Sequence, residues 1–261
     1  MSAASAIRAL SAFVFVIAAG FANAADIRVF SSGAPAGAAR AIAADFAGRT
    51  GHHLTFMVDQ PAVIQAHLAS GEKADVVILP SPVVTMLTGT GVLTAGSSVE
   101  VARVGLGVVV RAGAALPDIS DVAAFGQLLR NAHSIVYPDP AETGGGSAGL
   151  AVARMIDKLG FTETVRPKLK VKSAIGGGVA LVADGTVEIG IFNISEIMPV
   201  KGVALAGSLP AELQNYIVFD AAIPKGNPAP EPAAGFIKSL TDPAERPAWL
   251  HAGLDPIDAA H

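Results

Sequence analysis

The 261-residue sequence contains no cysteine, few aromatic residues and few charges. Without cysteine there can be no disulfide, no thiolate metal site and no acylated cysteine of the bacterial lipoprotein kind. Aromatic residues make up 5% of the chain and the net charge is −4, which argues against a nucleic-acid surface, because such surfaces need basic clusters and stacking rings. What the chain has instead is 51% hydrophobic residues with many Ala and Gly, a composition typical of a compact α/β protein.

Residues 1–24 have the pattern of a cleavable secretory signal. Arg8 is the only charged residue in this stretch, residues 13–19 form an apolar run, and Ala22, Asn23 and Ala24 give a small-x-small cleavage site. The apolar run is too short to span a bilayer. We therefore expect a mature protein that begins near Ala25 and is released into the periplasm.

The first half of the mature chain alternates between predicted strands and predicted helices. Strands are expected over residues 27–30, 54–58 and 74–79, and helices with a 3.6-residue apolar period follow the first two strands. This βαβαβ order predicts a parallel sheet with right-handed crossovers. The loops after these strands open at the carboxyl edge, where open α/β sheets bind ligands.

The second half repeats this plan and suggests a second lobe. Residues 99–110 read as one long strand that could cross between two lobes, and residues 215–219 start a strand that returns. We expect one lobe from residues 25–104 together with 220–261, a second lobe from 105–219, and a hinge of two crossing strands.

Several strand-to-helix loops are built from small, uncharged residues, and these are the candidate ligand contacts. Such a loop presents unpaired backbone N–H groups and the positive end of a helix dipole, an arrangement that suits a small anion. No catalytic residue and no cofactor is predicted, and the histidines lack a paired metal spacing. The predicted ligand-binding residues are Ser31, Ser32, Gly33, Asp59, Gln60, Gly146, Ser147 and Asn193.

Over essentially all of the mature chain, the sequence resembles the periplasmic molybdate-binding proteins and related substrate-binding proteins of bacterial ABC transporters. The motifs that carry the resemblance are VFSSG at 29–33, Gly71 with ADVV at 74–77, EIGI at 188–191, and Phe236 and Ile237 followed by Asp242 and Pro243. The resemblance implies a two-lobed periplasmic binding protein fold of class α/β, each lobe a mostly parallel sheet flanked by helices, with a two-strand hinge. It also implies a ligand held between the lobes and delivery to an inner-membrane permease.

The positions that would contact molybdate differ from the family pattern. Aligned on the motifs, the two loop serines of the family fall on Ala34 and Pro61, and its tyrosine falls on Asn193. Asp59 would also repel a nearby dianion unless it points into water, and Asp139 and Glu142 add to that repulsion. Either these carboxylates cap turns and face away, or the ligand is not a bare dianion. We therefore expect a small polar, anionic ligand, either an oxyanion such as molybdate or, as the favoured alternative, a small organic acid.

Two other functions fit parts of the sequence. Residues 145–149 match the G-x-S-x-G pattern of a serine hydrolase, with Ser147 as nucleophile and His251 downstream, although a loop separates the predicted strand from the helix. A sensory protein could use the same two-lobed site to report its ligand to a membrane receptor. The sequence favours a monomeric, non-enzymatic binding protein with no nucleic-acid partner.

Overall fold

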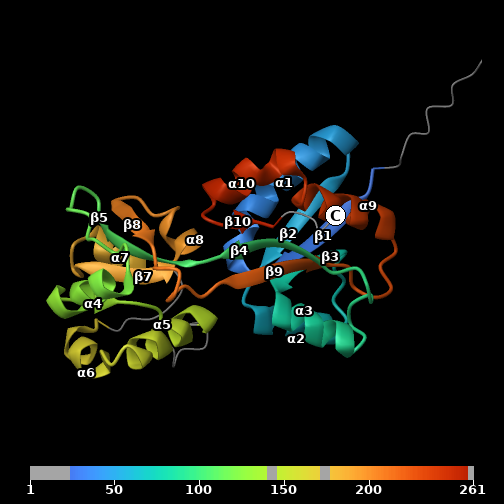
Figure 1. Cartoon of the computed structure of the whole chain (residues 1–261). Coiled ribbons are helices and arrows are strands. Elements are labelled where there is room, and N and C mark those ends of the chain that lie inside the picture. Colours follow the sequence, from blue (N-terminus) through green and yellow to red (C-terminus); the bar gives the residue numbers. More distant parts are fainter. Residues whose placement is uncertain (1–23, 140–145, 171–176, 258–261) are drawn as a thin grey trace, which may run out of the picture.

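The structure, a computed structural model, describes residues 24–139, 146–170 and 177–257. All but the last residue of the predicted signal at residues 1–24 therefore lies outside the described residues. Two sheets stand side by side, each with its own helices, and two stretches of chain pass between them (Figure 1). Within the described ranges, no helix is both long enough and apolar enough to cross a membrane.

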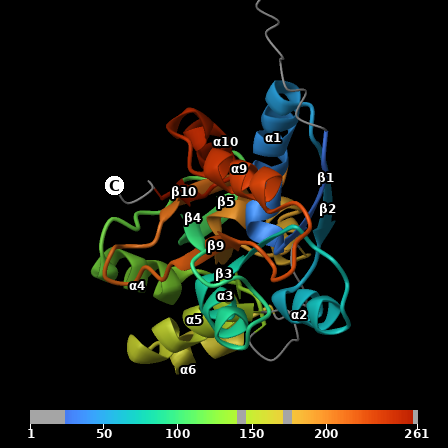
Figure 2. The same cartoon turned by 90° about the vertical axis from the view of Figure 1, so that its right-hand side faces the viewer.

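The first sheet has six strands in the order β10-β4-β9-β3-β1-β2. Its strands are β1 (Asp26–Ser31), β2 (His53–Val58), β3 (Val76–Pro80), β4 (Val99–Val104), β9 (Ile217–Ala222) and β10 (Asp255–Pro256). Helices α1 (Gly33–Thr50), α9 (Pro230–Leu240) and α10 (Arg246–His251), with the short η2 (Pro243–Glu245), cover one face. Helices α2 (Pro61–Ala69) and α3 (Ser81–Gly89) cover the other face (Figure 2).

The second sheet has four strands in the order β6-β7-β5-β8. Its strands are β5 (Leu106–Arg111), β6 (Ile135–Val136), β7 (Ile189–Asn193) and β8 (Val203–Ser208). Helices α4 (Val122–Asn131), α5 (Gly146–Lys158) and α6 (Thr162–Val165), which η1 (Arg166–Lys168) follows, pack on one face. Helices α7 (Gly177–Ala183) and α8 (Ile194–Ile197) pack on the other.

The two-lobed α/β architecture agrees with the sequence prediction, but the sheets are mixed rather than mostly parallel. Strand β1 is parallel to β2 and β3, whereas β9 is antiparallel to both β3 and β4. In the second sheet β5 is antiparallel to β7 and β8, and the β6–β7 pair is parallel. The reason is that strands at the crossings enter a sheet from the other lobe, so their direction is set by the crossing and not by a βαβ unit.

The predicted long strand over residues 99–110 is broken at Gly105. Strand β4 ends at Val104 in the first sheet and β5 begins at Leu106 in the second. Beside the break, the Gln214 amide accepts a hydrogen bond from the Leu106 N–H (2.7 Å) and donates one to the Leu106 carbonyl (2.9 Å). A Cβ at Gly105 would lie 3.0 Å from the Gln214 side chain, so the glycine gives this amide room.

The single tryptophan lies in the core. Trp249 is fully buried among residues of α1, α9 and the first sheet, and its indole N–H donates to the Leu240 carbonyl (2.9 Å). A buried tryptophan with its polar atom satisfied is a structural residue and not a ligand platform.

Gly178, at the start of α7, packs directly on the ring of Phe192. An added Cβ would lie 2.5 Å from the ring, and the buried ring is also confined by Gly190, where a Cβ would come within 2.7 Å. The ring therefore has little space into which it can move. The carboxyl end of β7 is fixed by this close contact.

We predict that Gly178→Ala lowers the free energy of unfolding by about 1–3 kcal/mol, the usual cost of overpacking a core. Urea unfolding followed by circular dichroism measures this loss of unfolding free energy. The matched control is Gly37→Ala in α1, where a Cβ meets nothing within 4 Å and alanine should be neutral or stabilising by up to about 1 kcal/mol. Equal stability of Gly178→Ala and Gly37→Ala would show that Phe192 yields easily.

Candidate functional site

The predicted ligand residues of the first lobe lie together at one sheet edge. Ser31 ends β1 beside Val58, the last residue of β2, and the Asp59 N–H donates to the Ser31 carbonyl (3.2 Å). Helix α1 begins directly after Ser32 and α2 directly after Gln60. The structure thus brings Ser31, Ser32 and Gly33 next to Asp59 and Gln60.

The two serine hydroxyls of this edge already donate to backbone carbonyls. Ser31 is fully buried and its Oγ donates to the Ser32 carbonyl (2.9 Å). Ser32 is 4% exposed, and both its N–H (2.9 Å) and its Oγ (3.2 Å) donate to the Ile78 carbonyl. Each hydroxyl would have to turn before it could donate to a ligand. Gly33, by contrast, has open space where a side chain would be.

The helices that start at this edge leave their first N–H groups without a side-chain cap. Neither Ser32 before α1 nor Gln60 before α2 caps its helix, and neither helix has an acidic residue in its first turn. Helix α4, in contrast, is capped by Asp121, which accepts from the Ala124 N–H (2.8 Å). Uncapped N–H groups and the positive end of the helix dipole together attract anions.

Asp59 behaves as a turn residue. Its side chain is exposed, and Oδ1 accepts a hydrogen bond from the Gln60 N–H (2.7 Å). This bond gives the carboxylate a local structural role, one of the two alternatives left open by the sequence. A ligand contact by Asp59 stays a prediction.

Asn193, the predicted residue of the second lobe, begins a turn of three polar side chains. We call Asn193, Ser195 and Glu196, at the end of β7 and the start of α8, the Asn193 turn. Asn193 is 7% exposed, and its Nδ2 donates to Glu196 Oε1 (2.7 Å). Asn193 Oδ1 and Ser195 Oγ are buried and have no hydrogen-bond partner among the described residues. Burial raises the pKa of Glu196, against a smaller lowering by the hydrogen bond from Asn193.

The Asn193 turn lies where the two lobes meet. The N–H of Ile194 donates to the carbonyl of Gly105 at the crossing (3.0 Å), and α8 lies against α1 of the first lobe (Figure 1). Gly253, just after α10, packs so tightly on Ile194 and Met198 that a Cβ would come within 2.9 Å of each. Helix α8, which the turn begins, is therefore in contact with the crossing at Gly105 and with the first lobe.

The predicted loop before α5 is described in part only. Gly146 and Ser147 are the first residues of α5, but the positions of their side chains, and Glu142, lie outside the described residues. The hydrolase elbow is not formed, because β6 ends at Val136 and α5 begins at Gly146. His251 is exposed at the end of α10 in the other lobe.

The sequence analysis missed three polar residues at the same edge of the second sheet. Ser195 and Glu196 follow the predicted Asn193, and Tyr137 follows β6, which runs parallel to β7. Burial and the nearby charge of Asp139 raise the pKa of Tyr137, so its phenol keeps its proton as a donor. The available signal was their position just after buried strands, the same signal that had selected Asn193.

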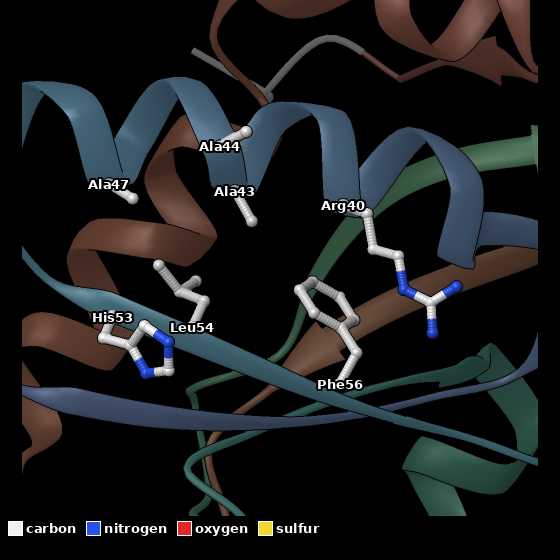
Figure 3. Close-up of a pocket in the computed structure, with 7 residues that line it drawn as sticks. All are labelled: Arg40, Ala43, Ala44, Ala47, His53, Leu54 and Phe56. Carbon is white, nitrogen blue, oxygen red and sulfur yellow. The ribbon is translucent and has the colours of Figure 1, made fainter.

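A separate groove of about 380 Å³ lies between α1 and β2, away from these residues (Figure 3). It is lined mainly by apolar side chains, with the Arg40 guanidinium 5.6 Å from the centre of the Phe56 ring. No predicted ligand residue lines it. In the described part of the chain, no group of three or more His, Asp or Glu side chains is arranged to hold a metal ion.

Solved structures share the fold at low sequence identity. The substrate-binding domain assigned to a molybdenum ABC transporter of Clostridium difficile is 13% identical, with a TM-score of 0.78 over 90% of this chain and 100% of that one. PEB3 of Campylobacter jejuni with bound L-phospholactate is 14% identical, with a TM-score of 0.67 over 88% of this chain and 99% of that one.

A curated relative is more similar in sequence. It is an aconitate isomerase of a Pseudomonas species, 29% identical over 239 residues, which are 89% of this chain and 88% of the relative. The sequence also matches the family described as bacterial extracellular solute-binding protein over residues 27–255. That match spans both sheets and the uncapped amino ends of α1 and α2. It confirms the predicted resemblance at the level of family and fold. The chain therefore belongs to the family of bacterial extracellular solute-binding proteins.

Proposed function

We propose that the protein is the periplasmic substrate-binding component of an ABC uptake transporter, and that it holds a small organic acid between its lobes. The observation that carries the proposal is that α1 and α2 begin side by side. Neither helix has a side-chain cap or an acidic residue in its first turn. Hydrogen bonds to a charged ligand give about 1.5–3 kcal/mol each, so a handful of N–H donors suffices for micromolar binding after ordering costs.

An organic acid is favoured over molybdate for two reasons. The residues that match the molybdate contacts of the family are Ala34, Pro61 and Asn193, and the hydroxyls of Ser31 and Ser32 are occupied by backbone carbonyls. In addition, the curated relative is named for an organic acid, aconitate, and PEB3 was solved with the organic acid phospholactate. We therefore take trans-aconitate as the first ligand to test.

The proposed mechanism is closure of the lobes around the ligand. We assign residues 25–104 and 220–261 to the first lobe and 105–219 to the second, a division supported by the break at Gly105. Strand β9 pairs with β4 in the first sheet from Ile217 on, so the second crossing lies just before Ile217, three residues ahead of this boundary. Closure requires that the ligand bind the closed form more tightly than the open form. The loaded protein would then dock on a membrane permease as a monomer.

The first test is thermal unfolding of the mature protein with cis-aconitate, trans-aconitate, citrate, molybdate and sulfate. We expect a tricarboxylate to raise the melting temperature, because a ligand at 100 times its Kd adds about 2.7 kcal/mol to native stability. Gly33→Asp should abolish this shift, since it places a carboxylate at the amino end of α1, where space is open.

Gly48→Asp is the matched control for this test. Gly48 is exposed at the other end of α1 and also has room for a side chain, so this variant should keep the ligand-induced shift. Stabilisation by molybdate or sulfate alone would contradict the organic-acid assignment.

The aconitate isomerase relative makes an enzymatic role the second candidate. We expect cis-aconitate incubated with the protein to be recovered unchanged, as a carrier requires, with proton NMR as the measurement. Appearance of trans-aconitate faster than in a protein-free sample would instead assign the isomerase function. The Asn193→Ala variant, run in parallel, would separate activity of this site from a contaminant.

A further inference from the structure

The amide of Asn193 is satisfied at one end only. Its Nδ2 donates to Glu196 Oε1 (2.7 Å), whereas its Oδ1 is buried and has no partner among the described residues. A buried acceptor left without a hydrogen bond costs about 1–3 kcal/mol. The nearby Ser195 Oγ is also buried and unpartnered. The turn therefore holds two buried polar atoms whose hydrogen-bonding capacity is not used by the described residues.

The ionisation of Glu196 decides which end of the Asn193 amide can face it. An ionised carboxylate only accepts hydrogen bonds, so it holds the NH₂ end and leaves the carbonyl oxygen to point away. A protonated carboxyl can donate its O–H to Oδ1. A half turn of the terminal Asn193 torsion, whose energy profile is broad and roughly two-fold, then brings the NH₂ end to the position that Oδ1 held.

We propose that Glu196 is a positioning residue whose proton switches Asn193 from presenting an acceptor to presenting a donor, so that a carboxylate ligand binds together with one proton. This inference rests on the proposed function, because it takes an organic anion as the ligand. An ionised Glu196 disfavours the anion both by its own charge and by the oxygen that Asn193 then presents. A protonated Glu196 removes both effects at once.

The surroundings of Glu196 favour such a proton. Burial raises its pKa, and the one opposing cause is the hydrogen bond from Asn193. Strands β7 and β8, which pack against α8, carry no charged side chain. The charged or titratable residues on the other elements around α8 are Arg40, Asp45 and Arg49 on α1, Arg111 on β5, Lys201 after α8, and Arg246 and His251 on α10.

The charged side chains around α8 whose contacts are described are directed to residues other than Glu196. Arg40 lies over Phe56, and Arg49 pairs with Glu245 (3.1 Å). Arg111 lies beside Gly185, at the end of β5 away from the crossing. Lys201 and His251 are exposed. None of the ion pairs found among the described residues includes Glu196.

The ligand-free protein gives the direct test. Side-chain amide signals of Asn193, assigned by their loss in Asn193→Asp, are followed from pH 4 to pH 9 by proton–nitrogen NMR. We expect both amide signals to move with a single pKa, above the ordinary glutamate value, and to be independent of pH in Glu196→Gln. Amide signals of Asn193 that stay constant in the wild type would overturn the proposal, whatever the ligand is.

The second measurement is the affinity for trans-aconitate by calorimetry from pH 5 to pH 9. Above the Glu196 pKa, the wild type should lose up to tenfold in affinity per pH unit, because one proton is taken up with the ligand. Glu196→Gln should lack this proton-linked loss, since the glutamine NH₂ can donate to Asn193 Oδ1 at every pH.

The exposed Glu212 supplies the control variant, Glu212→Gln, which should keep the wild-type dependence. Ionisation of trans-aconitate itself is common to all three proteins and cancels in the comparison. The same pH dependence in Glu196→Gln as in the wild type would contradict proton-linked binding. Absence of binding to all three proteins would instead count against the proposed function, and the NMR titration would still decide the role of Glu196.

Discussion

The pairing of the Gln214 side chain with the backbone of Leu106 joins the two stretches of chain that connect the lobes. Leu106 is the first residue of β5, and both its N–H and its carbonyl bond the Gln214 amide. The Leu106 carbonyl also accepts from the Leu209 N–H (3.0 Å), so both crossings meet at this residue. Gly105 permits the approach because it has no side chain. The start of α8 is bonded to the same junction, because the Ile194 N–H donates to the Gly105 carbonyl (3.0 Å).

Much of the fold could be predicted because its signals are local. Apolar runs such as 74–79 and the 3.6-residue period of α1 depend on neighbouring residues only, and they gave the strands and helices of the first lobe. Strand directions at the crossings could not be predicted in this way. They depend on Gly105, a single residue within an apolar run, and on its contact with Gln214 more than a hundred positions later. Strand β8 could not be predicted either, because it pairs with β5 across about a hundred residues of sequence.

The candidate site was predictable to the same extent. Position after a buried strand selected Ser31, Ser32 and Asn193, and the structure places these at the sheet edges expected of them. Sequence alone could not indicate that the serine hydroxyls are used by backbone carbonyls, because their acceptors, Ser32 and Ile78, are identified only by folding. Nor could it indicate that Glu196 loses water through burial, which is a property of packing between α8 and the elements around it.

The glycines around Phe192 have a mechanical consequence for the residue that follows. With its ring confined by Gly178 and Gly190, Phe192 adds side-chain packing to the β5 pairing that holds the end of β7. The backbone of Asn193 is therefore held both by this packing and by its pairing with Leu106 in β5. Rotation about its side-chain torsions can therefore exchange the amide oxygen and nitrogen without a change in the backbone.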